Sequence, residues 1–223
     1  MPPGRSAPRP DDGRRRAGRR SGRARQGREG PPRERGAWRF AGAAAEVTAL
    51  PHLGLPEIAF AGRSNVGKSS LINELTRTPS LARTSATPGR TQQINFFELP
   101  GTVAFADLPG YGFARVPERV RAAWKPLVEG YLATRETLRA VVLIIDPRRG
   151  IETDDRRLLA FLDGCGRPTV VVASKVDKLG RADLERAIAE ITLVVPEVVS
   201  FSARSGEGQR QLWRRLATLA ALR

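Results

Sequence analysis

A phosphate-binding loop is indicated by the residue types and spacing at positions 62–69. The segment reads G-x-x-x-x-G-K-S, with a strand predicted before it and a helix after it. The two glycines let the main chain curl closely around phosphates, and the N-terminus of the next helix favours anions. We expect Lys68 to reach the β- and γ-phosphates and the Ser69 hydroxyl to bind Mg²⁺. The predicted nucleotide ligands in this loop are Gly62, Arg63, Ser64, Asn65, Val66, Gly67, Lys68 and Ser69.

A second element of such a site is predicted where the segment D-x-x-G ends a later strand. Asp107 would hold Mg²⁺ through a water molecule, and the Gly110 N–H would sense the γ-phosphate. D-x-x-G alone is usually a turn, but its place two strands after a phosphate loop favours the functional interpretation. The predicted ligands are Asp107, Leu108, Pro109 and Gly110.

Between these elements, residues 83–92 form a polar, hydroxyl-rich stretch interrupted by Pro88-Gly89. Its length and position suit a switch loop that orders around the γ-phosphate, although a plain surface loop has the same composition. We expect Thr91 to complete the Mg²⁺ shell with Ser69, with Thr87 as the alternative. Nucleotide contacts are predicted at Gly89, Arg90, Thr91, Gln92 and Gln93, and catalytic roles at Lys68, Thr91 and Gly110.

A base-reading site is predicted at positions 174–177, which read S-K-V-D after a strand. The Asp177 carboxylate can accept from N1–H and the exocyclic amine of guanine, and adenine does not offer this pair of donors. The stem of Lys175 can lie across the base, and the Ala203 N–H after the last strand can donate to guanine O6. The predicted base-site residues are Ser174, Lys175, Val176, Asp177, Phe201, Ser202 and Ala203.

The residue that would orient the hydrolytic water is not evident. Many small GTPases place a glutamine directly after D-x-x-G, but this chain has Tyr111 there. We therefore expect slow intrinsic hydrolysis that an outside group completes. A bound K⁺ is one hypothesis, because Asn65 occupies the loop position that coordinates K⁺ in some related GTPases.

The elements that must position these residues follow an α/β pattern, with apolar runs alternating with amphipathic stretches. We predict a three-layer P-loop GTPase fold with a six-stranded, mostly parallel sheet flanked by helices. Strands 93–99 and 102–107 should form an antiparallel hairpin at one sheet edge, and Thr153 or Asp154 could cap a helix. The other strands are expected at 57–61, 140–146, 169–174 and 198–202, and the helices at 68–75, 117–134, 153–162, 181–194 and 208–219.

Composition separates a tail from this domain. Residues 1–36 contain twelve arginines and four acidic residues, a net +8 of the chain's +15, and almost no apolar residue. We therefore predict a disordered basic tail at 1–36 and a GTPase domain at 37–223. The basic charge favours a polyanionic partner, nucleic acid first and an anionic membrane surface second.

One cysteine and one histidine exclude a disulfide framework and a His/Cys zinc site. The apolar runs are too short to span a bilayer, so we expect a cytoplasmic protein without stable membrane association, and a monomer by default. Two other functions fit parts of the sequence: a P-loop ATPase or kinase, against which Asp177 argues, and a nucleic-acid-binding module with a vestigial nucleotide site. The intact Lys68, Ser69 and Asp107 argue against the module.

Taken together, G-R-S-N-V-G-K-S-S-L-I-N, T-P-G-R-T-Q-x-I-N-F-F, D-L-P-G-Y-G-F-A, S-K-V-D-K-L and F-S-A resemble the EngB (YihA/YsxC) family of ribosome-biogenesis GTPases, within the Era/EngA/TrmE-like P-loop GTPases. The resemblance covers roughly residues 38–220. It implies binding of GTP or GDP with Mg²⁺, direct metal ligation by Ser69 and Thr91, a large ribosomal subunit precursor as partner, and a link to cell division and septation. Ser174 departs from the family, which more often has Thr there, and the tail has no counterpart in the family core.

Overall fold

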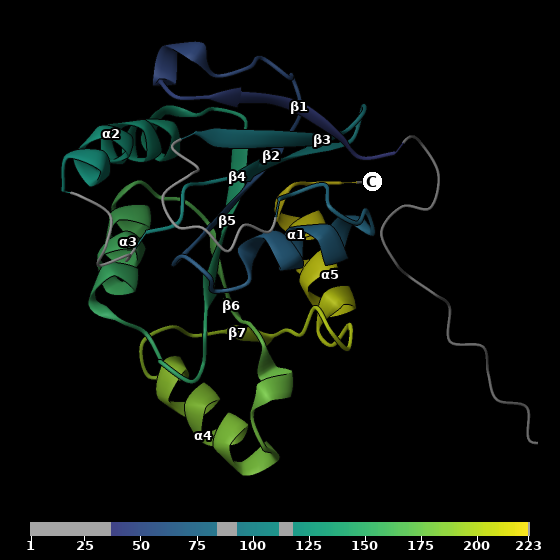
Figure 1. The fold of residues 1–223 in the computed structure, drawn as a ribbon, viewed down its shortest axis with the longest axis vertical. Coiled ribbons are helices and arrows are strands. Elements are labelled where there is room, and N and C mark those ends of the chain that lie inside the picture. Colours follow the sequence, from purple (N-terminus) through teal and green to yellow (C-terminus); the bar gives the residue numbers. More distant parts are fainter. Residues whose placement is uncertain (1–36, 84–92, 112–117, 223) are drawn as a thin grey trace, which may run out of the picture.

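The computed structural model describes residues 37–83, 93–111 and 118–222, and side chains from residue 125 onward in the last of these ranges. Seven strands form one sheet in the order β1-β3-β4-β2-β5-β6-β7 (Figure 1). The strands are β1 (Arg39–Ala44), β2 (Glu57–Gly62), β3 (Ile94–Leu99), β4 (Val103–Asp107), β5 (Leu138–Ile145), β6 (Thr169–Ala173) and β7 (Val198–Ser200). The helices are α1 (Lys68–Thr76), α2 (Glu118–Thr134), α3 (Thr153–Gly164), α4 (Arg181–Thr192) and α5 (Gln209–Leu219), with short 3₁₀ turns η1 (Val47–Ala49) and η2 (Val176–Lys178).

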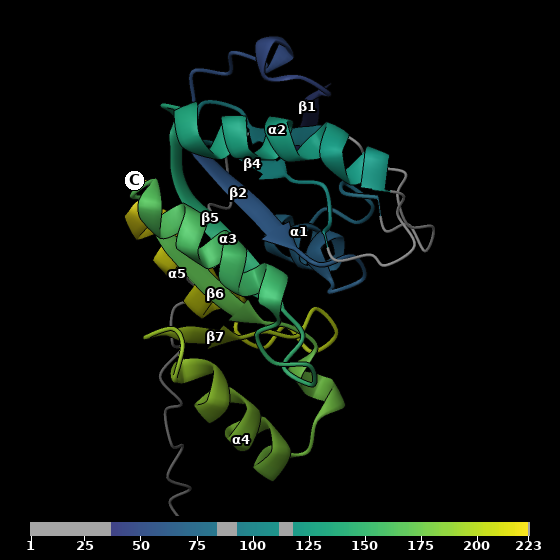
Figure 2. The same ribbon diagram turned by 90° about the vertical axis from the view of Figure 1, so that its left-hand side faces the viewer.

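Helices cover both faces of the sheet and make three layers (Figure 2). Every residue of β2 is buried, because alternate side chains of this central strand pack against opposite helices. Ile58 and Phe60 belong to a core with α1 and α5, whereas Ala59 and Ala61 belong to a second core with α2 and α3. α4 packs through Ile191 onto a third cluster with β5 and β6.

The parallel strands β2, β4, β5 and β6 bring their carboxyl ends to one edge of the sheet. Phe60 is level with Asp107, and Ile145 is level with Ala173. In such sheets ligands bind outside the carboxyl ends of the strands. The predicted phosphate and base segments follow the carboxyl ends of these strands, so the sheet topology brings the segments together at one edge.

The α/β prediction is confirmed, but the sheet has seven strands instead of six. The additional strand, β1, pairs antiparallel with β3, with a register shift between Phe40 and Gly42. It has a weak pattern, RFAGAA, and only Ala44 in it is buried, as suits an edge strand. The predicted hairpin exists as β3 and β4, but β1 covers it, so it does not lie at the sheet edge.

The cap of α3 also differs from the prediction. Glu152 is the N-cap residue, and it forms a capping box with Asp155. Neither Thr153 nor Asp154 has the cap role. Over the described ranges, none of the helices combines the length and the apolar character that crossing a bilayer requires.

Candidate nucleotide-binding site

The phosphate loop joins β2 to α1, and its glycines stand where a side chain would not fit. A Cβ at Gly62 would lie 2.7 Å from the Ile144 carbonyl oxygen. Gly67 is the N-cap of α1 with φ 107°, a left-handed conformation that L side chains rarely adopt. The loop therefore keeps its main chain bare at the N-terminus of a helix, which is the arrangement that binds phosphate.

Lys68 and Asp107 meet at this loop. The Lys68 ammonium contacts Asp107 Oδ1, and the two side chains are only 12% and 7% exposed. Ser69 lies next to Lys68 in the first turn of α1, and Asp107 ends β4, the neighbour of β2. The two predicted metal-side elements thus come together, and their donors are a hydroxyl and a carboxylate.

Gly110 lies against the phosphate loop. The Ser64 N–H donates to the Tyr111 carbonyl oxygen at 3.0 Å, and the Tyr111 N–H donates to the Gly62 carbonyl oxygen at 3.3 Å. A Cβ at Gly110 would come within 2.9 Å of Ser64 Oγ and 3.2 Å of Ser64 main-chain atoms. The D-x-x-G segment is therefore joined through its main chain to the loop that it is predicted to serve.

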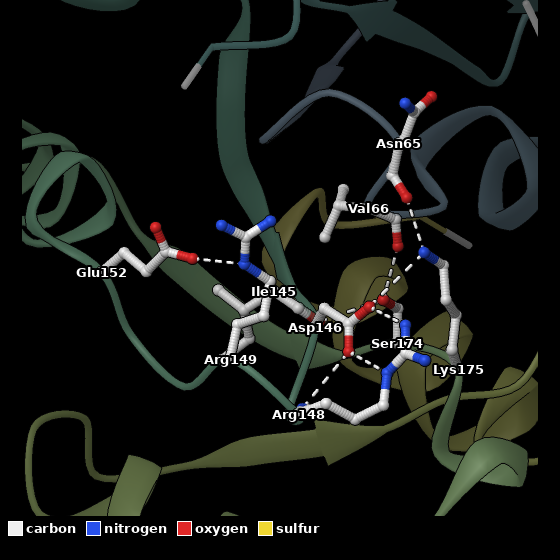
Figure 3. Close-up of polar contacts among 9 residues, drawn as sticks. All are labelled: Asn65, Val66, Ile145, Asp146, Arg148, Arg149, Glu152, Ser174 and Lys175. Atoms are coloured by element: carbon white, nitrogen blue, oxygen red, sulfur yellow. Dashed lines mark hydrogen bonds and ion pairs between the residues drawn. The ribbon is translucent and has the colours of Figure 1, made fainter. Parts of the chain in front are cut away.

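The base-reading segment is attached to the phosphate loop by two side chains (Figure 3). The Ser174 hydroxyl donates to the Val66 carbonyl oxygen at 2.6 Å and also lies 3.0 Å from the Ile145 carbonyl oxygen. Lys175 has a left-handed φ of 56°, and its ammonium donates to the Asn65 carbonyl oxygen at 2.5 Å. The hydroxyl that Ser174 shares with Thr therefore joins the base-reading segment to the phosphate loop.

The carboxylate of Asp177 is held by Ser202. Ser202 Oγ donates to Asp177 Oδ1 at 2.6 Å and accepts from the Arg204 and Ser205 N–H groups at 3.2 Å each. Ser202 is fully buried, whereas Asp177 is exposed. The Val176 N–H also donates to the Phe201 carbonyl oxygen at 3.3 Å. The two predicted base-site segments thus form one unit with its carboxylate at the surface.

Sequence reasoning missed Asp146, which follows β5 and lies beside Lys175. Asp146 accepts from Arg148 Nε at 2.8 Å and from the Arg148 main-chain N–H at 3.2 Å, and Lys175 Nζ lies 3.4 Å from its other oxygen. Burial acts to raise the pKa of Asp146, but the hydrogen bonds from Arg148 and the charges of Arg148 and Lys175 outweigh it and lower the pKa. A lone aspartate after a strand was the only signal in the sequence.

Glu152 and Asp155, at the start of α3, also lie beside the phosphate loop and the D-x-x-G segment. Arg63 Nη1 lies 2.7 Å from Glu152 Oε2, and the Tyr111 hydroxyl donates to Asp155 Oδ1 at 2.7 Å. Neither acidic residue was predicted to lie at the site, since nothing in the spacing relates α3 to the phosphate loop.

Part of the predicted site lies outside the described residues, namely Gly89, Arg90, Thr91 and Gln92, together with the alternative Thr87. Gln93 is described and is exposed just before β3. The segments at 62–69, 107–110, 174–177 and 201–203 all lie at the carboxyl edge of the sheet.

Comparison with known sequences agrees with this geometry. A family model described as "50S ribosome-binding GTPase" matches residues 57–175, which include the phosphate loop, D-x-x-G and the first part of the base-reading segment. The "Probable GTP-binding protein EngB" of Syntrophus aciditrophicus is 50% identical over 176 residues, covering 78% of this chain and 90% of the relative. The protein of the same name from Solibacter usitatus is 52% identical over 164 residues, covering 74% and 86%.

Solved structures give the same result. The crystal structure of a probable GTP-binding protein engB superposes with a TM-score of 0.60 at 27% identity, covering 74% of this chain and 98% of that one. Era in complex with MgGDPNP and nucleotides 1506–1542 of 16S ribosomal RNA gives 0.61 at 25% identity, covering 77% and 58%. This chain therefore belongs to the EngB family of GTP-binding proteins and is a GTP-hydrolysing enzyme.

Proposed function

We propose that this GTPase is a Mg²⁺-dependent switch in assembly of the large ribosomal subunit, and that it is needed for normal cell division and septation. The observation that carries guanine-nucleotide binding, on which the proposed switch depends, is the attachment of the base-reading segment to the phosphate loop, through Lys175 to Asn65 and Ser174 to Val66. Base and phosphates are then read by one rigid unit. The ribosomal partner is supported by the description of the matching family and by the Era relative bound to ribosomal RNA.

In this proposal Lys68 and Gly110 act on the phosphates. Lys68 belongs to the phosphate loop, and its ammonium contacts Asp107. The β- and γ-phosphates would therefore compete with the Asp107 carboxylate for the Lys68 ammonium. The bare main chain at 62–67 supplies N–H donors, and Asp177 with the Ala203 N–H reads guanine. Thr91, Gly89, Arg90, Gln92 and Gln93 would close over the γ-phosphate.

The donors at the metal end fit Mg²⁺, which prefers hard oxygen ligands and keeps several waters. The Ser69 hydroxyl would ligate the ion directly, Thr91 would add a second hydroxyl, and Asp107 would act through a water molecule. When bound, the ion would neutralise phosphate charge. The role of the chain is to hold Asp107 and Ser69 on neighbouring elements, at the end of β4 and the start of α1.

The group that completes hydrolysis would come from outside the chain, and a K⁺ ion at Asn65 would be a further contributor. The Tyr111 hydroxyl is already bonded to Asp155, so it does not take the place of a glutamine. Asn65 has a left-handed φ of 64°, and in Figure 3 its amide points away from Lys175. We infer slow intrinsic turnover that the ribosomal precursor accelerates. Equal turnover in K⁺ and Na⁺ buffers would reject the K⁺ hypothesis.

Residues 37–223 would form the GTPase domain and work in the cytoplasm as a monomer, without stable membrane association. The tail at 1–36 lies outside the described residues, and in this proposal it is a basic arm of the domain. The charge outside the tail is +7, so the domain itself favours rRNA phosphate. Deleting residues 1–36 separates the contribution of the tail from that of the domain.

Competition of GTP, GDP and ATP against a fluorescent GDP analogue tests the base site. GTP and GDP should compete, ATP should not, and Asp177→Asn should weaken GDP binding by about 100-fold, since the amide keeps only one acceptor oxygen, carries no charge, and turns an NH2 donor toward a donor of guanine. Cosedimentation with large-subunit precursors should then require a GTP analogue. Competition by ATP as strong as that by GDP would refute the assignment of Asp177, and binding to precursors independent of nucleotide would refute the switch.

A further inference from the structure

The start of α3 contacts both segments that flank the γ-phosphate side of the site. Asp155 accepts from the Tyr111 hydroxyl at 2.7 Å, and Glu152 pairs with Arg63 at 2.7 Å. Tyr111 directly follows D-x-x-G, and Arg63 is the second residue of the phosphate loop. The N-terminus of one helix thus contacts two segments of the site, although Arg63 and Tyr111 are 48 residues apart in the chain.

These carboxylates are themselves fixed in place. Asp155 is 1% exposed, and its Oδ2 accepts from the Glu152 N–H at 2.9 Å in the capping box. Glu152 also pairs with Arg149 Nε at 2.5 Å (Figure 3). The acceptor for the Tyr111 hydroxyl therefore has little freedom to move, because a helix cap and a buried position both hold it.

The position of Tyr111 controls that of Gly110. The Tyr111 main chain bonds to Gly62 and Ser64 on either side of Arg63, with which it forms a parallel bridge. Gly110 is so close to Ser64 that a Cβ would not fit. A fixed side chain at Tyr111 thus holds the Gly110–Tyr111 peptide against the phosphate loop, and through the Gly110 Cα it restrains the adjoining Pro109–Gly110 peptide, which carries the Gly110 N–H.

The phenol is suited to a permanent donor role. Burial raises the pKa of Tyr111 strongly, and the Asp155 charge and hydrogen bond raise it further, with Arg63 acting in the opposite direction. The hydroxyl therefore stays protonated at neutral pH and keeps its bond to the carboxylate.

We propose that Tyr111 and Asp155 are positioning residues for GTP hydrolysis, which hold the Gly110 N–H ready for the γ-phosphate before GTP binds. This inference rests on the γ-phosphate role proposed for Gly110. A donor that is already in place spares the ligand the entropy of ordering it. GDP has no γ-phosphate, so the Tyr111–Asp155 bond should favour GTP over GDP.

The chain offers a matched control for the test. Its only other tyrosine, Tyr131, donates its hydroxyl to the buried Glu57 carboxylate at 2.9 Å. Glu57 begins β2, whereas Gly62 at the phosphate loop ends it. Tyr111→Phe and Tyr131→Phe therefore delete the same chemical group from the same kind of bond at opposite ends of one strand.

Dissociation constants for GDP and a non-hydrolysable GTP analogue, with kcat/KM for GTP, should be measured on both variants after thermal unfolding has established that they fold. Tyr111→Phe should weaken the GTP analogue by about five- to tenfold and lower kcat/KM by a similar factor, the loss expected for one such hydrogen bond. Its GDP affinity should stay within about twofold. Tyr131→Phe should lower the melting temperature and leave the ratio of GTP to GDP affinity unchanged.

Two further variants, Asp155→Asn and Gly110→Ala, separate a failure of the positioning role from a failure of the role proposed for Gly110. Asp155→Asn keeps one neutral acceptor oxygen for the Tyr111 hydroxyl, while its NH2 faces the Glu152 N–H. It should lower the ratio of GTP to GDP affinity by less than Tyr111→Phe does, and it serves as the test if Tyr111→Phe does not fold. Gly110→Ala tests the underlying role. If Gly110→Ala alters the GTP to GDP ratio and neither Tyr111→Phe nor Asp155→Asn does, the positioning role is wrong. If none of the three alters it, the role of Gly110 in the proposed function is wrong as well.

Discussion

At the scale of single residues, the base site depends on a buried serine that reads no base itself. Ser202 has no exposed surface, and its hydroxyl orients the exposed Asp177 carboxylate while it closes the turn to Arg204 and Ser205. A carboxylate that is held in one rotamer needs no ordering when guanine binds, so Ser202 should contribute to affinity through Asp177.

Ser202→Ala should therefore weaken GDP and GTP equally, by about tenfold, since one hydrogen bond to a charged group is lost. Isothermal titration with both nucleotides measures the effect. Ser205→Ala is the control, because Ser205 Oγ only accepts from the Glu207 N–H at 3.4 Å in an exposed part of the same turn. Equal losses in the two variants would mean that the turn, and not the bond to Asp177, matters.

Asp146 is a second residue that supports the site through its neighbours and is not itself predicted to contact the nucleotide. It holds Lys175 and Arg148, and the lowered pKa gives a direction for the effect of pH. The folded pKa lies below the ordinary value of 3.8, so the ionised form contributes stability above that value, and the contribution is lost as pH falls through the folded pKa.

Asp146→Asn should weaken GTP and GDP alike at pH 7, by about tenfold, because Lys175 loses a charged partner next to the phosphate loop. The variant should also lose less stability than the wild type as pH falls below about 4, since it lacks the titrating carboxyl. Nucleotide titrations and urea unfolding measure the two effects. Glu185→Gln, which breaks the exposed pair with Arg181 on α4, should change neither.

The residues that the sequence could predict are those in spaced patterns. Gly62, Gly67, Lys68 and Asp177 could be predicted because fixed spacing and a preceding strand define them. The partners of Tyr111 could not be found in this way, because Asp155 is 44 residues away and packs there only through the tertiary fold. Long-range contacts of this kind leave no periodic signal.

At the scale of elements, the same distinction explains why β2 was predicted and β1 was not. Each residue of β2 is buried, and its apolar run is recognisable. β1 is mostly exposed and contains a glycine, and it is held by tertiary contacts such as Arg39 to Glu98 at 2.6 Å and the Phe40 and Phe97 rings at 6.1 Å. Strand pairing at an edge depends on the neighbouring strand, which the local pattern does not report.

Another element contact fixes the end of α2. Glu57, fully buried at the start of β2, accepts from Arg135 at 2.6 Å, from Tyr131 at 2.9 Å and from Thr137 at 2.8 Å. Arg135 is 11% exposed and also donates to the Pro51 carbonyl oxygen at 2.5 Å. The helix that follows the D-x-x-G segment in the chain is thus anchored at the end of the sheet away from the phosphates.

Glu57→Gln should lower the free energy of unfolding by about 3 kcal/mol, because Arg135 would keep a buried charge without its carboxylate partner. Urea unfolding checks the value. Glu129→Gln on the same helix removes an exposed pair with Lys125 at 3.6 Å and should change stability by less than about 0.5 kcal/mol. GDP affinity should be unchanged in both. A Glu57→Gln protein as stable as Glu129→Gln would show that the anchor is dispensable.

At the scale of the whole molecule, two buried tyrosines, one near each end of the sheet, should make the stability of the protein depend on pH in the alkaline range. Burial raises the pKa of Tyr111 and of Tyr131, and the bonded carboxylates Asp155 and Glu57 raise them further. Unfolding would return each phenol to its ordinary pKa of about 10. Their contribution to stability is therefore fully present below pH 10 and is lost progressively as pH rises above it toward the folded values.

Urea unfolding at a series of pH values from 8 to 11 should show this loss. Above pH 10 each buried phenol should steepen the decline by about 1.4 kcal/mol per pH unit, because the unfolded chain releases a proton that the native chain keeps. Tyr111→Phe and Tyr131→Phe should each remove one such contribution, and the double variant both, while lysine titration stays common to all four proteins. Tyrosinate absorbance should rise together with unfolding and not before it. A rise in the folded protein would mean that the phenols ionise in place, and the carboxylate bonds at the two ends of the sheet would then be too weak to hold Gly110 or α2.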